Sequence, residues 1–272
     1  MANVFIMIDH RKAIRKSVLS AIDKFGIHSE MDSKYLLRMY GNGDLGKYSQ
    51  RLERLGFVDC DDVLDAGCGY GQWSLALAEL NLRVTSVDVD KSRSEVTSYI
   101  AEQNGLGNIN STCASMESLP FSNNAFDAVF CYAALPLTRY LQTLREFMRV
   151  LRPGGKLYFG AYDIGHMLYN IVSPHNPTSD FNPRKWAAKA IIDTDTYLES
   201  SIFAPSSPRD SLYIPIDTVL DFMAKAGYKN IQWDCDGKLS ISGKSPGDSF
   251  ASGEFLGFPG VYEVLCTSRD FN

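Results

Sequence analysis

Beyond Gly56, short runs of β-forming residues alternate with longer amphipathic stretches, and this alternation restricts the possible folds more than any other feature of the chain. Strands that alternate with helices predict a mostly parallel sheet with crossover helices on both faces. We therefore expect an α/β fold. The runs that we assign to strands are VLDAG at 63, RVTSVDV at 83, INSTCA at 109, FDAVFCYA at 126, KLYFGAY at 156, NIQWDC at 230 and VYEVLCTS at 261.

The stretches between these runs have the chemistry of helices. Asp90 is a candidate N-cap for one of them, because an aspartate oxygen can accept hydrogen bonds from first-turn amides. Another is stopped sharply by the sequence Arg152-Pro153-Gly154-Gly155. The expected helices cover residues 72–80, 91–104, 139–151 and 216–226.

Two segments lie outside the alternating pattern. Residues 1–58 carry apolar residues at helical spacing without a strand-like run, which predicts an N-terminal helical lid. Residues 162–215 carry six prolines among aromatic residues, which predicts an inserted substrate cap. The core then comprises residues 59–161 and 216–272, and its Gly- and Ser-rich stretch before residue 261 is either mobile or part of a site.

The run VLDAGCGYGQWS brings Asp65 from a strand into Gly67, Gly69 and Gly71, directly before a helical stretch. Glycines at this spacing let the backbone turn tightly and approach a ligand closely. A dinucleotide-binding fingerprint would need glycine where Gln72 stands, so that kind of site loses support. Simple helix–strand packing remains an alternative role for the glycines.

The chain resembles class I S-adenosylmethionine-dependent methyltransferases over about residues 56–161, in four motifs that follow the family's order. Asp65 and the three glycines resemble the first motif. Asp88, 23 residues later at the end of the next strand, resembles the family's acidic residue, which can accept both ribose hydroxyls, although it could instead cap the following helix. CASMESLPFSNNAFDAVFCYAALPL resembles the third and fourth motifs, and RVLRPGGKLYF resembles the connection into the fifth strand.

This resemblance implies a Rossmann-like seven-stranded, mostly parallel sheet that binds S-adenosylmethionine and releases S-adenosylhomocysteine. Ser115 and Met116 would flank the adenine, and Cys131 and Tyr132 would lie beside the methionine moiety. Tyr40, together with Tyr48, is placed over the methionine end. The complete set expected to bind the cofactor is Tyr40, Asp65, Gly67, Cys68, Gly69, Gly71, Asp88, Val89, Ser115, Met116, Cys131 and Tyr132.

Two departures from the family pattern bear on the site. Ser115 stands where many relatives carry Asp, and nothing after Phe130 matches the Asn/Asp-Pro-Pro-Tyr/Phe of enzymes that methylate amino groups of nucleic acids. The second departure argues against base N-methylation. A net charge of -5 and a pI near 5.4 also argue against a nucleic-acid partner. We therefore expect a small-molecule methyl acceptor, with the methylated atom left open.

His166 and Asp163 are the candidate catalytic bases because they follow the fifth strand-like run, and His175 lies further along. A solvated loop residue is the ordinary alternative for each. Clefts for small molecules are mainly lined by apolar and aromatic side chains. The aromatic residues that we assign to the acceptor pocket are Tyr40, Tyr162, Tyr169, Phe181 and Trp186.

Other classes of protein fit less well. No tyrosine is followed four residues later by lysine, as a short-chain dehydrogenase requires. The six cysteines form no Cys-x-x-Cys pair, so we expect no metal site, and a reducing cytoplasm fits. No apolar run approaches the roughly 18 to 20 residues of a membrane span. An RNA or protein methyltransferase, or a non-catalytic cofactor-binding sensor or partner subunit, remains the alternative, and the oligomeric state is left open.

Overall fold

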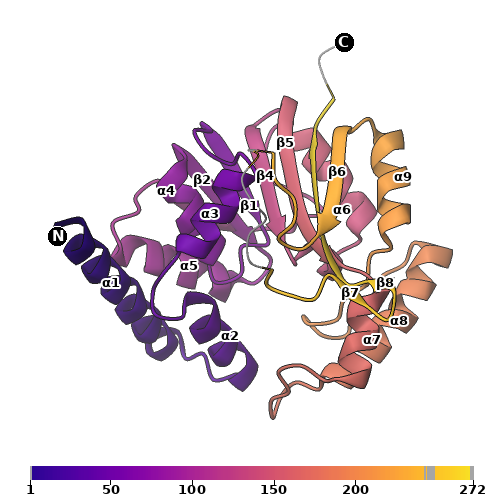
Figure 1. Cartoon of the computed structure of the whole chain (residues 1–272), viewed down its shortest axis with the longest axis horizontal. Helices are drawn as coiled ribbons and strands as arrows, with labels where there is room; N and C mark the ends of the chain where they lie inside the picture. Colours follow the sequence, from indigo (N-terminus) through magenta and orange to yellow (C-terminus); the bar gives the residue numbers. More distant parts are fainter. Residues whose placement is uncertain (1, 242, 244–248, 270–272) are drawn as a thin grey trace.

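The computed structural model describes residues 2–241, 243 and 249–269. Within them, seven strands form one sheet in the order β3-β2-β1-β4-β5-β9-β6, in which β1 to β5 are parallel and β9 is antiparallel to its neighbours β5 and β6 (Figure 1). The predicted Rossmann-like sheet is confirmed. Its strands are β1 (Asp62–Ala66), β2 (Arg83–Asp88), β3 (Ile109–Cys113), β4 (Phe126–Tyr132), β5 (Leu151–Tyr162), β6 (Lys229–Cys235) and β9 (Val261–Thr267).

Helices cover both faces of the sheet because successive strand residues point to opposite sides and are buried on each. In β5, Leu157 and Phe159 join the apolar core under α6 and α9, whereas Tyr158 joins the core under α3, α4 and α5. The core helices are α3 (Gly46–Arg54), α4 (Gln72–Leu80), α5 (Lys91–Gln103), α6 (Tyr140–Val150) and α9 (Ile216–Ala226), with the short 3-10 helix η1 (Leu135–Leu137) after β4.

One predicted boundary needs correction. The helix expected over 139–151 ends at Val150, and β5 already begins at Leu151, so Pro153 and the glycines after it lie within the strand. The register between β4 and β5 shifts between Phe126 and Ala128, and Gly154 has a φ of 73°. A bulge of this kind accommodates a proline and a left-handed glycine without ending the strand.

The remaining helices lie outside the sheet. The N-terminal segment contributes α1 (Ala2–Phe25) and α2 (Glu30–Tyr40), and the inserted segment contributes α7 (Ile164–Val172) and α8 (Pro183–Ser200). A two-stranded hairpin, β7 (Glu254–Phe255) and β8 (Phe258–Pro259), lies in the Gly- and Ser-rich stretch, where we expected no strand. Among the described residues, no helix combines the length and apolarity that crossing a bilayer requires.

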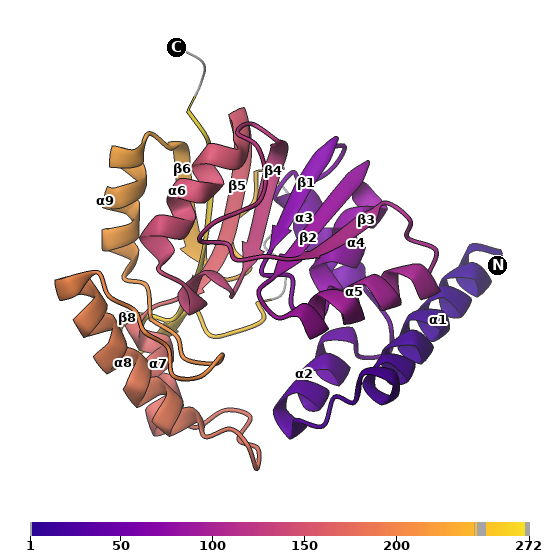
Figure 2. The same cartoon turned by 180° about the vertical axis from the view of Figure 1, so that it is seen from behind.

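Both views place α2 beside the tip of the loop between α7 and α8, although about 150 residues of chain separate them (Figures 1 and 2). The N-terminal and inserted segments therefore meet at this loop. The inserted segment has its own small apolar cluster around Met167, Ala187 and Ala190. The buried α2 residues Leu36 and Tyr40 belong instead to a main-sheet cluster.

Candidate functional site

The glycine loop joins the end of β1 to the start of α4. Gly67, Gly69 and Gly71 have φ angles of 75°, 55° and 84°, which L-residues with a β-carbon rarely adopt. A β-carbon on Gly67 would lie 2.2 Å from the Ala134 β-carbon, and one on Gly71 would lie 2.6 Å from Thr97 Cγ2. A β-carbon on Gly69 meets no atom within 4 Å. Gly67 and Gly71 thus serve close packing, whereas Gly69 borders open space.

Asp88 lies at the end of β2, beside this loop. Its Oδ2 accepts a hydrogen bond from the Gly69 amide at 2.9 Å, and its Oδ1 accepts one from the Asp90 amide at 2.9 Å. Burial raises the pKa of the Asp88 carboxyl, while these hydrogen bonds and the charge of Arg93 oppose that shift. Asp90, as predicted, accepts the hydrogen bond from Ser92 that caps α5, so the capping role that we left open for Asp88 belongs to Asp90.

Asp65 is the second carboxylate of the loop and is only 1% exposed. Burial raises its pKa to about 7, a hydrogen bond from Ser74 Oγ at 2.6 Å opposes the shift, and the negative charge of Asp88 adds to it. A carboxyl with this pKa is shared between its neutral and charged forms near neutral pH. Two interacting carboxyls therefore flank the glycine loop.

Three residues of the predicted cofactor-binding set follow β2 and β3, which are parallel neighbours. Val89 is 74% exposed, directly after Asp88. Met116 is buried, with its thioether sulfur 3.4 Å from the position that a β-carbon on Gly67 would take. Ser115 Oγ accepts a hydrogen bond from the Glu117 amide. An exposed and a buried apolar side chain thus lie at neighbouring strand ends beside the loop.

The two cysteines of the predicted site are poor nucleophiles. Cys131 is fully buried, and burial raises its pKa to about 12. Burial also raises the pKa of Cys68 well above the usual value for a thiol. Because the thiolate is the reactive form, both side chains contribute packing and backbone rather than thiol chemistry.

Tyr132 ends β4 with its side chain on the other face from Cys131. Its hydroxyl donates to Asp236 Oδ1 at 3.1 Å, and Arg51 of α3 contacts the same oxygen at 2.5 Å. Both Arg51 and Asp236 are almost completely buried. This buried ion pair fastens α3 to the loop that follows β6.

α2 contacts the glycine loop directly. The Tyr40 hydroxyl donates to the Tyr70 carbonyl at 2.7 Å, and the Tyr35 hydroxyl accepts from Gln72 Nε2 at 3.3 Å. We did not single out Tyr35 from the sequence, although its position five residues before Tyr40 on an amphipathic helix is a usable signal. Tyr48 packs instead against Trp73, with ring centroids 4.7 Å apart.

Of the two candidate bases, Asp163 has both carboxylate oxygens occupied. Oδ1 accepts from the Ile164 amide at 2.6 Å, where it caps α7, and Oδ2 accepts from the Ile216 amide at 2.9 Å, at the start of α9. Burial raises its pKa. These bonds hold the carboxylate between the starts of α7 and α9, where Asp163 is only 4% exposed.

His166 lies on α7 among aromatic rings. Its ring is stacked on Tyr162 at 5.3 Å and meets the edge of Trp186 at 6.0 Å. Burial, followed by the charge of His175, lowers its pKa to about 4. The imidazole is therefore neutral at physiological pH, and its Nε2 lies 3.2 Å from the Asn170 side-chain amide.

The other aromatic residues assigned to the acceptor pocket also lie on the inserted segment. Phe181 lies 6.1 Å from Trp186, between ring centroids, and Tyr169 lies 5.4 Å from Phe255 of the β7–β8 hairpin. Tyr40 lies on α2 and contacts the glycine loop instead. Three of the five residues, Tyr162, Phe181 and Trp186, thus gather near His166.

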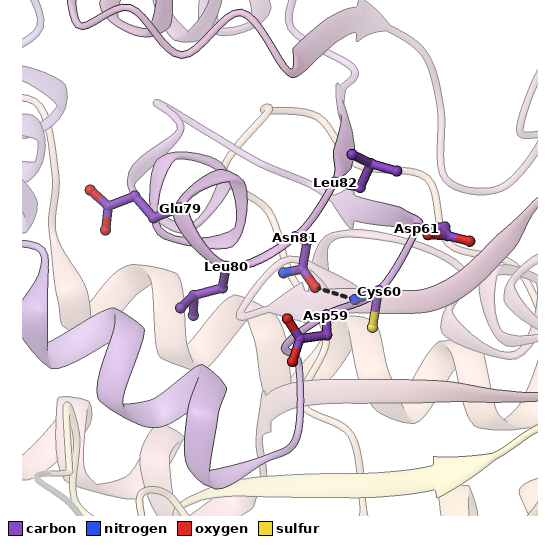
Figure 3. Close-up of a pocket in the computed structure, with 7 residues that line it drawn as sticks. All are labelled: Asp59, Cys60, Asp61, Glu79, Leu80, Asn81 and Leu82. Carbon is purple, nitrogen blue, oxygen red and sulfur yellow. Dashed lines mark hydrogen bonds between the residues drawn. The ribbon is translucent and has the colours of Figure 1, made fainter.

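A hollow of about 420 Å³ lies at the opposite edge of the sheet, at the amino ends of β1 and β2 (Figure 3). Asn81 Oδ1 accepts the Cys60 amide there at 2.9 Å. Open α/β sheets bind ligands at the carboxyl ends of their strands, so this hollow is not where the fold places its ligand. The lining residues are Asp59, Cys60, Asp61, Glu79, Leu80, Asn81 and Leu82.

Known proteins with similar sequences are methyltransferases, and the family match includes the glycine loop and the first strands of the sheet. The profile of a family described as "Methyltransferase domain" matches residues 63–155. An uncharacterized methyltransferase of Bacillus subtilis, YcgJ, is 32% identical over 119 residues, which cover 43% of this chain and 44% of YcgJ. A ubiquinone biosynthesis O-methyltransferase of Coxiella burnetii is 37% identical over 113 residues, covering 40% of this chain and 48% of that protein. The chain thus matches less than half the length of these relatives.

Solved structures share the fold over more of the chain. YcgJ superposes with a TM-score of 0.54 at 17% identity, covering 83% of this chain and 99% of YcgJ. The [4+2]-cyclase SpnF superposes with a TM-score of 0.55 at 18% identity, covering 82% and 80%. The sheet order and the glycine loop define a Rossmann-like methyltransferase fold. The sequence match to the methyltransferase-domain family is confined to residues 63–155, and over this part the chain is similar to known methyltransferases.

Proposed function

We propose that this protein transfers a methyl group from S-adenosylmethionine to a small-molecule acceptor. The observation that carries the proposal is the open space beside Gly69, next to an amide that bonds a buried carboxylate at the end of the adjacent strand. Anything larger than hydrogen on Gly69 would enter that space. A ligand with a ribose, whose hydroxyls pair with a carboxylate, suits this arrangement.

The residues around the loop fit the parts of this cofactor. Asp88 would accept the ribose hydroxyls, and Met116 and Val89 would cover the two faces of the adenine. Asp65 would lie near the glycine loop, which would hold the rest of the cofactor. When bound, S-adenosylmethionine supplies a methyl group on a positively charged sulfur. The protein's part is to orient the acceptor and exclude water, and orientation alone can lower a barrier by roughly 7 to 11 kcal/mol in well-aligned systems.

The acceptor side is proposed to lie between α2 and the aromatic residues of α7 and α8. His166 is the better candidate base, because Asp163 is only 4% exposed and its carboxylate bonds the amides at the starts of α7 and α9. A pKa near 4 makes the His166 imidazole a weak base. His166 would accept a proton only once methyl transfer has made the acceptor's nucleophilic atom acidic. A weak base of this kind favours acceptor atoms that can be methylated without prior deprotonation.

Calorimetry with S-adenosylmethionine and S-adenosylhomocysteine tests the proposal. Asp88→Ala should weaken both ligands by roughly 1.5 to 3 kcal/mol, since charge-assisted hydrogen bonds are lost. Asp61→Ala is the matched control, because Asp61 lines the hollow at the opposite edge of the sheet (Figure 3). Equal affinity for parent and Asp88→Ala, or a larger loss in Asp61→Ala, would rule out the assigned cofactor site.

A protein that binds the cofactor without turnover is the second candidate. It is favoured by the deep burial of Asp163 and the low pKa of His166, which leave no strong base among the residues that we assigned. Transfer of labelled methyl to a panel of small phenols, thiols and amines separates the two. Tight cofactor binding without transfer to any class would support this second candidate.

A further inference from the structure

Polar contacts join the N-terminal and inserted segments at one place, which we call the clasp. The Glu30 carboxylate accepts hydrogen bonds from the Ser179 amide at 2.8 Å and from its hydroxyl at 2.6 Å. The Ser29 hydroxyl donates to Asp180 Oδ2 at 2.6 Å. The clasp comprises Ser29, Glu30, Met31 and Asp32 on one side and Ser179, Asp180 and Arg209 on the other.

The start of α2 is capped from both sides of the clasp. Ser29 is its N-cap and accepts the Asp32 amide at 3.1 Å. Asp180, from the inserted segment, accepts the Met31 amide at 3.2 Å. The first amides of a helix lack partners within the helix and favour a negative charge. Asp180 therefore stabilises the start of α2 only while the two segments are together.

Arg209 and Asp32 connect the clasp to the cofactor side. Arg209 donates to Asp32 Oδ2 at 3.2 Å, and its own carbonyl accepts the Trp186 indole N–H at 3.0 Å, so it belongs to the inserted segment. Asp32 Oδ1 accepts from Arg93 at 3.3 Å. Arg93 in turn lies 3.8 Å from Asp90 Oδ2 and 5.4 Å from the centre of the Tyr70 ring in the glycine loop, and its charge opposes the rise that burial causes in the pKa of Asp88. The Asp32 carboxylate thus accepts hydrogen bonds from Arg209 of the inserted segment and from Arg93 of α5.

The clasp is held by polar contacts that water can reach. The side chains of Arg209, Asp32 and Asp180 are 26%, 22% and 34% exposed, and the apolar cluster of the inserted segment is separate from the one that holds α2. Exposed ion pairs are individually weak and are screened by salt. Such contacts can open and close without unfolding the sheet.

We propose that the clasp is a latch across the methyl-transfer site, and that Asp32 is the positioning residue that couples it to the bound cofactor. Closing joins α2, which contacts the glycine loop, to the segment that carries the aromatic residues around His166. Opening exposes the glycine loop and the aromatic residues around His166 to incoming ligands. The inference rests on the proposed function for its probe, S-adenosylhomocysteine, but the latch itself can also be observed without a ligand.

Arg209→Met and Asp180→Asn test the latch in the full-length protein. Both should raise the dissociation rate of S-adenosylhomocysteine, measured by stopped flow, about three- to tenfold, as expected for the loss of one or two partly exposed charged contacts. The Met31 and Asp32 amides should exchange with deuterium faster by a similar factor. In the parent, raising NaCl from about 0.05 to 0.5 M should speed release, and Arg209→Met should abolish most of that dependence.

Arg83→Met is the matched control. Arg83 makes a bidentate ion pair with Asp62 at the amino edge of the sheet. Loss of this pair should change neither the release rate of S-adenosylhomocysteine nor the exchange rate of the Met31 and Asp32 amides. Arg209→Lys keeps the charge and should retain part of the salt dependence. If release and exchange in Arg209→Met and Asp180→Asn equal those of the parent, there is no latch. Faster exchange with unchanged release overturns the coupling through Asp32.

The latch and the proposed function fail in different ways. If the parent binds no S-adenosylhomocysteine, the proposed function is wrong, and amide exchange at Met31 and Asp32 in the free protein still decides whether the clasp opens. If the ligand binds and both readouts change as stated, the latch holds, whether or not an acceptor is methylated.

Discussion

The proposed cofactor side and the proposed acceptor side of this molecule are built in different ways. On the cofactor side, Gly69 bonds Asp88 only 19 residues later, within one strand–loop–helix–strand unit. On the acceptor side, Ser29 bonds Asp180 after 151 residues, and the partners come from two segments outside the sheet. A site closed by short-range contacts leaves a contiguous motif in the sequence, whereas a site closed by long-range contacts leaves scattered polar residues.

The largest effect should come from the glycine loop, where two neighbouring glycines make opposite predictions. Gly67→Ala combines a strained φ with a clash against Ala134 and should lower the free energy of unfolding by about 3 to 5 kcal/mol. Gly69→Ala meets no atom and should cost only about 1 to 2 kcal/mol. Urea unfolding measures both.

A larger side chain at Gly69 tests whether the open space beside this residue holds the cofactor. Gly69→Val should remain folded yet lose most of its affinity for S-adenosylmethionine in calorimetry. If Gly69→Val binds as well as the parent, the cofactor does not lie beside Gly69. If Gly67→Ala is as stable as Gly69→Ala, the two glycines do not differ as the loop geometry indicates.

The N-terminal segment is attached to the rest of the chain by the buried Arg51–Asp236 pair and by the partly exposed clasp. Replacing one arginine of each with methionine compares the two attachments. Arg51→Met leaves the buried carboxylate of Asp236 without its ion-pair partner and should cost about 3 to 5 kcal/mol of stability. Arg209→Met, in the clasp, should cost about 1 kcal/mol or less. Thermal and urea unfolding of the pair measure the contrast. Equal losses would mean that the clasp is a structural junction rather than a latch.

The pH dependence of stability isolates Asp65 on the cofactor side. Its pKa of about 7 lies above the unfolded value of 3.8, so between these values the folded state holds a proton that the unfolded chain has released. The free energy of unfolding contributed by Asp65 therefore falls as pH rises through this window, by about 4 kcal/mol at most.

His166 titrates in the same window with the opposite sign, because its pKa is lowered to about 4 from 6.5. The measurement is therefore the difference between the parent and Asp65→Asn, from urea unfolding between about pH 4 and 8. That difference should change steadily up to about pH 7 and then level off. A difference that does not vary with pH would mean that Asp65 is ionised throughout.

The smallest effect on binding is expected on the acceptor side. Tyr162→Ala removes the ring that stacks on His166 and should reduce labelled methyl transfer to the parent's best acceptor by roughly tenfold, about 1.4 kcal/mol, with cofactor affinity nearly unchanged. Tyr99→Ala, on α5 against Phe25, is the control. Equal losses of transfer and cofactor affinity in Tyr162→Ala would contradict a separation of the two sides.

Much of the fold follows from sequence patterns, and the exceptions have physical causes. The apolar run of β4, which is buried over most of its length, and the N-cap Asp90 are local signals, so most strands of the sheet and α5 are predicted closely. Pro153 and the glycines after it indicate a turn by local propensity. In the structure they lie in β5, because pairing with β4 through a bulge outweighs that propensity.

The sequence by itself determined the parallel sheet, the left-handed glycine loop and the position of Asp88 at a strand end, because periodicity, glycine conformation and strand–helix alternation are properties of neighbouring residues. The tertiary structure alone decided that Asp163 accepts the Ile216 amide, that Arg51 pairs with Asp236, and that α2 is capped by Asp180. These contacts join residues far apart in the chain. Charge and hydrogen-bonding capacity are visible in a sequence, but which partner satisfies them depends on distances that only the packed chain sets.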